Sequence, residues 1–155
     1  MNLAEIIDAQ SVLPSLKVQG KKQLLQELAH AAGERLGIDH RLIFETLLQR
    51  EKLGSTGLGH GIAIPHGKIP ALTRVYGLFA RLTQPVEFDA IDGEPVDIAF
   101  LLLAPEHAGA DHLKALARIS RLLRDVDVVT KLRGTETAAG LYAILTEPAA
   151  TSHAA

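Results

Sequence analysis

The chain has 155 residues, a length typical of one folded domain, with 47% hydrophobic and 22% charged residues and a formal net charge of −2. The slightly acidic balance and the lack of tryptophan disfavour a nucleic-acid partner, which normally selects a basic surface with stacking side chains. Cysteine is absent, which excludes disulfides, thiolate catalysis and cysteine-ligated zinc.

Targeting and membrane signals are also missing from the sequence. The first residues carry no basic stretch followed by a long apolar run, so they do not resemble a signal peptide. The longest apolar run, Ile98 to Pro105, is too short to cross a bilayer. We therefore expect a cytoplasmic protein with no membrane insertion.

Two amphipathic helices are expected in the first third of the chain. The first is predicted over Lys21 to Gly37, where apolar residues recur at helical spacing: Leu24, Leu25, Leu28, Ala32 and Leu36. Asp39 is a suitable N-cap for the second, which Gly54 ends.

The middle of the chain favours strands. Gly54 to Gly67 reads GSTGLGHGIAIPHG, a glycine-rich loop that encloses a short strand-like segment. Val75 to Leu82 and Val96 to Leu103 are predicted strands, and the second is apolar enough to be central in a sheet covered on both faces. Asp92-Gly93 is a turn signal between them.

Helical periodicity returns after the strands. We expect helices over Asp111 to Arg124, around Asp127 to Leu132, and over Thr135 to Leu145 with Thr135 as N-cap. Helices first, strands in the middle and helices last predict a single layered α/β domain over residues 1–147, with a sheet that need not be all parallel. Residues 148–155 are expected to form a flexible tail.

The context of His66 makes it a candidate nucleophile. It follows the apolar Ile62 to Ile64 segment, Pro65 restricts the backbone before it, and Gly67 leaves room beside it. Neutral imidazole is a good nucleophile near pH 7, and a phosphohistidine bond is labile enough to be passed on.

Phosphate-binding groups accompany this histidine. His112 lies at the start of a predicted helix, where unpaired backbone N–H groups favour an anion, and Arg50 carries donors suited to phosphate oxygens. The loop residues expected to flank the phosphate are Ser55, Thr56, Gly57, Gly59, His60, Gly61 and Gly67.

Each part also has a plainer interpretation. Arg50 at a helix end can compensate the helix dipole, and glycine-rich loops are usually turns. His60 either flanks the site or faces water, whereas we expect surface or structural roles for the remaining histidines: His30, His40, His107 and His153. His60, His66, His107 and His112 with Asp111 can be drawn as a metal-ligand set, but their spacing fits no common zinc motif, so no metal or cofactor is expected.

Arg50 to Lys68 resembles the active-site segment of the IIA domains of the bacterial phosphoenolpyruvate-dependent phosphotransferase system. The match is to the fructose–mannitol class and most closely to its nitrogen-regulatory branch, which Gly67-Lys68 favours. A second block, Val96 to Pro105 followed by His112 to Arg124, looks like the same family. The resemblance extends from Leu3 to about Leu145.

The resemblance implies a type-2 IIA domain over residues 1–147, with a mixed sheet flanked by helices on both faces. It implies that His66 accepts phosphate from an HPr-like carrier, that His112 contacts the phosphoryl group without accepting it, and that Arg50 lies nearby. His60 stands where the family has Asn or Asp. It further implies regulatory protein partners linked to nitrogen or potassium status; the alternative is a sugar-transport component that passes phosphate to a separate IIB permease.

Overall fold

The computed structural model describes residues 2–147 and alternates helical and strand-rich segments as the sequence predicts. Two short 3₁₀ turns, η1 (Leu3–Glu5) and η2 (Ala9–Ser11), open the chain. The strands are β1 (Val12–Leu16), β2 (Gly57–Gly59), β3 (Ile62–Ala63), β4 (His66–Lys68), β5 (Tyr76–Val86) and β6 (Val96–Ala104). The helices are α1 (Lys21–Leu36), α2 (His40–Lys52), α3 (Ala110–Arg124), α4 (Val126–Arg133) and α5 (Ala138–Leu145).

Local sequence accounts for the bounds of the first two helices. Gly37 ends α1 in the left-handed region at φ 69°, and its N–H donates to the carbonyl of Gly33. The Asp39 carboxylate accepts a hydrogen bond of 2.9 Å from the N–H of Arg41, which caps α2 as predicted.

The six strands form one mixed sheet in the order β1-β5-β6-β3-β2, and β4 also pairs with β6. β5 and β6 are antiparallel, joined through a turn in which the N–H of Gly93 donates to the carbonyl of Ala90. β1 runs parallel to β5, and both β3 and β4 run parallel to β6. The mixed sheet and the central position of β6 are therefore confirmed.

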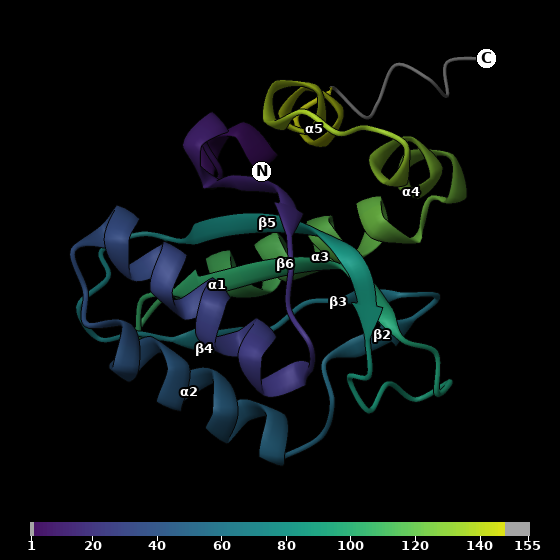
Figure 1. Cartoon of the computed structure of the whole chain (residues 1–155). Helices are drawn as coiled ribbons and strands as arrows, with labels where there is room; N and C mark the ends of the chain where they lie inside the picture. Colours follow the sequence, from purple (N-terminus) through teal and green to yellow (C-terminus); the bar gives the residue numbers. More distant parts are fainter. Residues whose placement is uncertain (1, 148–155) are drawn as a thin grey trace.

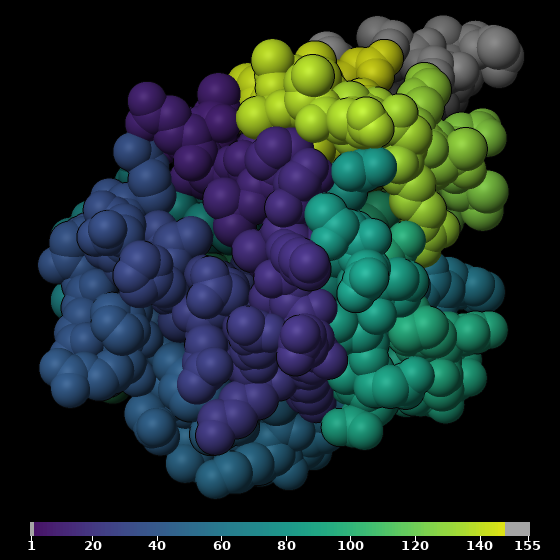
Figure 2. Space-filling model, viewed as in Figure 1, coloured from purple at the N-terminus to yellow at the C-terminus, as the bar shows by residue number. Residues whose placement is uncertain are grey.

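Helices cover both faces of this sheet (Figure 1). One hydrophobic cluster joins α1 and α2 to the face that includes Ala63, Leu101 and Leu103. The other joins α3, α4 and α5 to the opposite face, which includes Ile64 and Leu102. Figure 2 shows the N-terminal segment beside the C-terminal helices, where α5 contacts β1 and η2.

The structure differs from the sequence-based expectations at several elements. β1, β2 and β4 were not expected, because each is at most five residues long and contains Pro, Gly or polar residues. β5 continues past Leu82 to Val86, with an irregular register beyond Arg81.

The predicted N-cap of the last helix is wrong. Thr137, not Thr135, caps α5 by accepting from the N–H of Gly140. The Thr135 hydroxyl instead donates to the carbonyl of Lys131 at the end of α4.

The expected tail, residues 148–155, lies outside the described residues. Within residues 2–147, no helix is both long and apolar enough to span a membrane.

Candidate functional site

His66 is held by the central strand of the sheet. β3 and β4 pair with the same edge of β6 in one register, Ile62 opposite Ile98 and His66 opposite Leu102. Pro65 interrupts the strand, but its carbonyl still accepts from the N–H of Leu102 at 3.0 Å. Because side chains alternate along a strand, His66 shares a face with Ile62 and with Leu102, the face that α3 covers.

A hydrogen bond determines which nitrogen of His66 is nucleophilic. Nδ1 lies 2.8 Å from the carbonyl oxygen of Ile64. A carbonyl can only accept, so Nδ1 carries the proton and the lone pair is on Nε2. Burial lowers the pKa of His66, the Ile64 carbonyl raises it, and the positive charge of Arg50 lowers it further. The ring is therefore neutral and nucleophilic near pH 7.

The ring of His112 faces that of His66. The two centroids are 5.8 Å apart in an edge-to-face arrangement, and His112 is the third residue of α3. His112 is buried, and no residue within 2–147 hydrogen-bonds its buried Nδ1. An unsatisfied buried polar atom costs about 1–3 kcal/mol, and a binding role can explain its presence. Burial is the first cause that lowers the pKa of His112, followed by the charges of His66 and Lys68.

Arg50 approaches the same region from α2. Its side chain is partly buried, and Nη1 donates to the carbonyl of Gly54 at 2.9 Å, which holds the guanidinium at the end of the helix. Further N–H donors remain on the guanidinium. The structure places His66 beside His112, and the charge of Arg50 lowers the pKa of His66. A neutral nucleophile, a second imidazole and a guanidinium can transfer a phosphoryl group.

Comparison with known proteins identifies the family of the chain. Residues 5–147 match the family described as phosphoenolpyruvate-dependent sugar phosphotransferase system, EIIA 2. The chain belongs to this EIIA-2 family. A nitrogen regulatory protein of Bradyrhizobium diazoefficiens is 57% identical over 152 residues, which cover 98% of this chain and 99% of the relative.

Two solved structures extend the comparison. The nitrogen regulatory protein IIA-Ntr of Neisseria meningitidis has a TM-score of 0.88 and 38% identity, covering 93% of this chain and 99% of that chain. An Escherichia coli IIAMtl, solved in complex with phosphorylated IIBMtl, has a TM-score of 0.77 and 18% identity, covering 92% and 100%. The second likeness concerns the fold alone. The chain is thus an EIIA-2 domain similar to nitrogen regulatory proteins, and the family is one of phosphotransfer components.

The glycine-rich loop of this EIIA-2 domain is held mainly by its own hydrogen bonds. The N–H of Thr56 donates to the Glu51 carboxylate, and the N–H of Gly57 donates to the hydroxyl of Ser55. Ser55 in turn donates to the carbonyl of Phe88. Gly57 itself packs against Ala90. These residues support the segment before His66, and their contacts to a phosphate stay a prediction.

His60 and Gly61 form the turn between β2 and β3, and Gly59 precedes them at the end of β2. His60 is exposed and has a φ of 56°, and its N–H donates to Asp92 at 2.9 Å. Its carbonyl accepts from Arg133 at 2.6 Å. Gly59 and Gly61 also have positive φ, at 95° and 83°. The backbone of His60 is thus held by Asp92 and by Arg133 at the end of α4, while the residue itself is exposed.

Gly67 is required by a close approach to α2. A Cβ on this residue would lie 2.6 Å from the Cγ2 of Thr46. Because successive residues of a strand face opposite sides, Gly67 faces α2 while His66 faces α3. The missing side chain of Gly67 therefore serves packing against α2, on the opposite side of the strand from the imidazole.

Glu51, a buried charge beside Arg50, is not among the residues that the sequence singles out. Its carboxylate lies 3.0 Å from the Nζ of Lys21 and accepts two hydrogen bonds from Thr56. One signal was available: Glu51 continues the apolar spacing of Ile43 and Leu47 along α2, so a charge stands at a core position.

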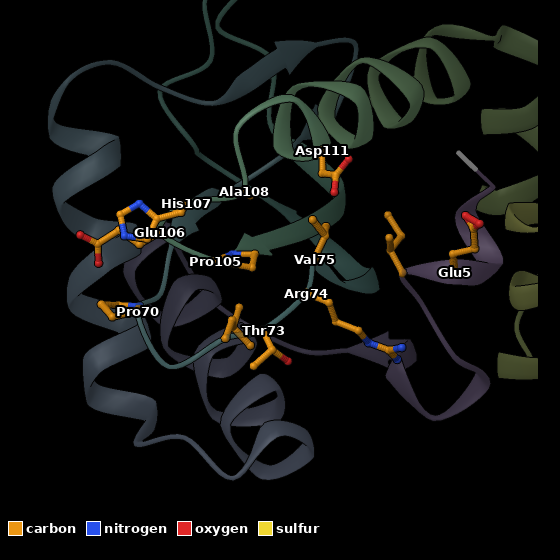
Figure 3. A pocket seen from close by; sticks show the side chains of 12 residues that line it. Glu5, Pro70, Thr73, Arg74, Val75, Pro105, Glu106, His107, Ala108 and Asp111 are labelled. Atoms are coloured by element: carbon orange, nitrogen blue, oxygen red, sulfur yellow. The ribbon is translucent and has the colours of Figure 1, made fainter.

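A separate cavity of about 680 Å³ lies beside the loop that precedes α3 (Figure 3). It is lined by Glu5, Ile6, Pro70, Leu72, Thr73, Arg74, Val75, Pro105, Glu106, His107, Ala108 and Asp111. Glu106 and His107 lie on one side, with Arg74 and Glu5 on the other. Its mixed charges favour no ligand class, and it includes neither His66 nor His112.

Within residues 2–147, no group of three His, Cys, Asp or Glu side chains gathers to hold a metal ion.

Proposed function

We propose that this chain is a phosphohistidine carrier of the cytoplasm that accepts phosphate on Nε2 of His66 from an HPr-like protein. The observation that carries the proposal is the 2.8 Å contact between Nδ1 of His66 and the Ile64 carbonyl, which leaves the Nε2 lone pair free beside His112. No cofactor or metal is needed, because the nucleophile and the charge-stabilising groups all come from the chain.

The transfer follows from these groups. The Nε2 lone pair attacks the phosphorus of the donor's phosphohistidine, a P–N bond to His66 forms, and the P–N bond to the donor breaks. The donor imidazole leaves with the bonding electron pair. The proton of His66 stays on Nδ1, where it donates a hydrogen bond to the Ile64 carbonyl, while Arg50 and His112 stabilise the charge on the phosphoryl oxygens.

We infer that the phosphorylated histidine acts mainly as a regulatory switch on partner proteins. The 57% identical relative bears the name nitrogen regulatory protein, and so does the structural neighbour from Neisseria. A phosphoryl group adds up to about two negative charges to a surface that otherwise presents a neutral imidazole. Such a change favours some partners and disfavours others, and nitrogen or potassium status is the input that the family suggests.

Phosphate labelling tests the carrier function. Incubation with phosphoenolpyruvate, its enzyme I and an HPr-like carrier should add one acid-labile, base-stable phosphate to the chain. His66→Ala should abolish the labelling, since it removes the nucleophile without touching the backbone of β4. Undiminished labelling of that variant would contradict the assignment.

Sugar transport is the second candidate function. The structural neighbour from Escherichia coli is a mannitol IIA protein in complex with phosphorylated IIBMtl, and this chain has the same fold. If the phosphorylated chain transfers its phosphate to a fructose- or mannitol-type IIB protein, the transport function is supported. If it instead retains the phosphate and binds a kinase or channel subunit in a pull-down, the regulatory function is supported.

A further inference from the structure

Glu51 carries a buried charge for which the proposed phosphotransfer has no direct use. It lies in the last turn of α2, and its side chain is 3% exposed. Burying a carboxylate is unfavourable unless ion pairs and hydrogen bonds compensate it. Here the compensation is nearly complete: Lys21 lies 3.0 Å from Oε1, the N–H of Thr56 donates to Oε1, and the Thr56 hydroxyl donates to Oε2.

The lysine of this ion pair is itself held in place. Nζ of Lys21 lies 4.5 Å from the ring centroid of Phe88, a buried residue, and the Lys21 side chain is 20% exposed. The carbonyl of Phe88 accepts from Ser55, the neighbour of Thr56. The ion pair and these hydrogen bonds therefore connect the start of α1, the end of α2 and the loop after it.

A chain of hydrogen bonds connects this network to the nucleophile. The carbonyl of Thr56 accepts from the N–H of Ile64 at 3.1 Å. The carbonyl of Ile64 accepts from Nδ1 of His66 at 2.8 Å. Glu51 thus helps to hold the backbone of Thr56, and Thr56 is hydrogen-bonded to Ile64. The carbonyl of Ile64 in turn orients the imidazole of His66 and selects its tautomer.

We propose that Glu51 is a positioning residue for His66, which acts through Thr56 and Ile64 to hold the imidazole with Nε2 free for phosphoryl transfer. This inference rests on the proposed function of His66. The charge of Glu51 also acts on the ring directly, since it raises the pKa of His66 against the lowering effects of burial and of Arg50. His112 of α3 also faces the imidazole.

Two substitutions separate positioning from simple stability. Glu51→Gln keeps the shape and removes the charge, and Thr56→Val removes the hydroxyl while keeping the N–H. Thr56→Ser keeps both donors and serves as the conservative rescue. Glu45→Gln is the matched control, because it makes the same chemical change at an exposed position of the same helix.

The readouts are the rate of phosphate uptake, the melting temperature, and nitrogen-15 NMR of the His66 ring in the unphosphorylated chain. We expect Glu51→Gln to slow uptake on the order of tenfold to a hundredfold, the loss that misplacement of a reacting group causes. The Nδ1–H tautomer should lose population and the pKa of His66 should fall. Thr56→Val should show the same changes in smaller measure, Thr56→Ser should show smaller changes than Thr56→Val, and Glu45→Gln should match the wild type.

The inference is overturned if Glu51→Gln and Thr56→Val leave the tautomer, the pKa and the uptake rate unchanged, whatever happens to the melting temperature. If Glu51→Gln does not fold, Thr56→Val decides alone. If the wild-type chain takes no phosphate at all, the carrier function fails, whereas a change of His66 tautomer in Thr56→Val still supports the positioning role.

Discussion

At the scale of single residues, the two neighbours Arg50 and Glu51 have different surroundings. Glu51 is buried in a network of partners, while Arg50 is partly buried and bonded to the carbonyl of Gly54. Charged groups at such a helix end often serve only the helix dipole. The effect of Arg50 on the pKa of His66 indicates that its charge reaches the site.

Removing Arg50 should therefore affect phosphotransfer more than folding. Loss of a charge-assisted hydrogen bond costs about 1.5–3 kcal/mol, which is roughly one to two decades in a rate. Arg50→Ala should slow phosphorylation or shorten the lifetime of the phosphoprotein, and thermal stability should stay nearly constant. Lysine should restore only part of the rate, because a point charge cannot replace the planar fork. Wild-type transfer rates in Arg50→Ala would leave Arg50 as a surface charge.

His112 should stabilise the phosphoryl group without accepting it. Its Nδ1 is buried without a partner in residues 2–147, whereas the tautomer of His66 is set by the Ile64 carbonyl. His112→Gln keeps a side-chain donor, so the variant should still be phosphorylated, with slower uptake or altered onward transfer. The measurement is labelling of both single variants. Phosphate on His66→Ala but none on His112→Gln would mean that the two roles are reversed.

At the scale of elements, the contact between β4 and α2 is closer than any side chain at position 67 permits. A Cβ on Gly67 would approach the Cγ2 of Thr46 to 2.6 Å. Overpacking of this kind typically costs about 1–3 kcal/mol. Gly67→Ala should therefore lower the free energy of unfolding and displace the strand that carries His66.

A double-mutant cycle tests this explanation. Thr46→Ser removes Cγ2 and keeps the hydroxyl that donates to Leu42, so it should relieve most of the cost of Gly67→Ala. Gly134→Ala is the control, because a Cβ there would meet its nearest neighbour at 3.5 Å and the backbone φ is −90°. An equal cost of Gly67→Ala in both backgrounds, measured by chemical denaturation, would rule out Thr46 as the obstacle.

Local sequence patterns predict some of the helices and strands and not others. The periodicity of α1, α2 and α3 and the apolar run of β6 predicted these elements and their order, because burial of one face or both leaves a direct mark on composition. The sequences of β1, β2 and β4 show no such apolar pattern, because these short strands are stabilised by pairing with neighbouring strands. Local sequence patterns do not specify which strands pair.

The candidate site likewise has features that the sequence predicts and features that it does not. His66, His112 and Arg50 stand in recognisable local contexts, and the sequence singled out all three. The tautomer of His66 depends on a carbonyl two residues away, and Glu51 depends on Lys21 from another helix. Both relations are tertiary, so composition and spacing could not predict them.

At the scale of the whole molecule, the candidate site draws its residues from three layers: the sheet and the helices on each of its two faces. The sheet supplies His66 through the register of β6, α3 supplies His112 from one face, and α2 supplies Arg50 and Glu51 from the other. β4 thus lies at the place where both helical layers approach the sheet.

The most direct test of the account is nitrogen-15 and phosphorus-31 NMR of the chain after phosphorylation by an HPr-like carrier. We predict a single phosphohistidine signal, assigned to His66, with the phosphorus coupled to Nε2 and the proton retained on Nδ1. A phosphate on Nδ1 of His66, on His112, or on no histidine at all would contradict the proposed function.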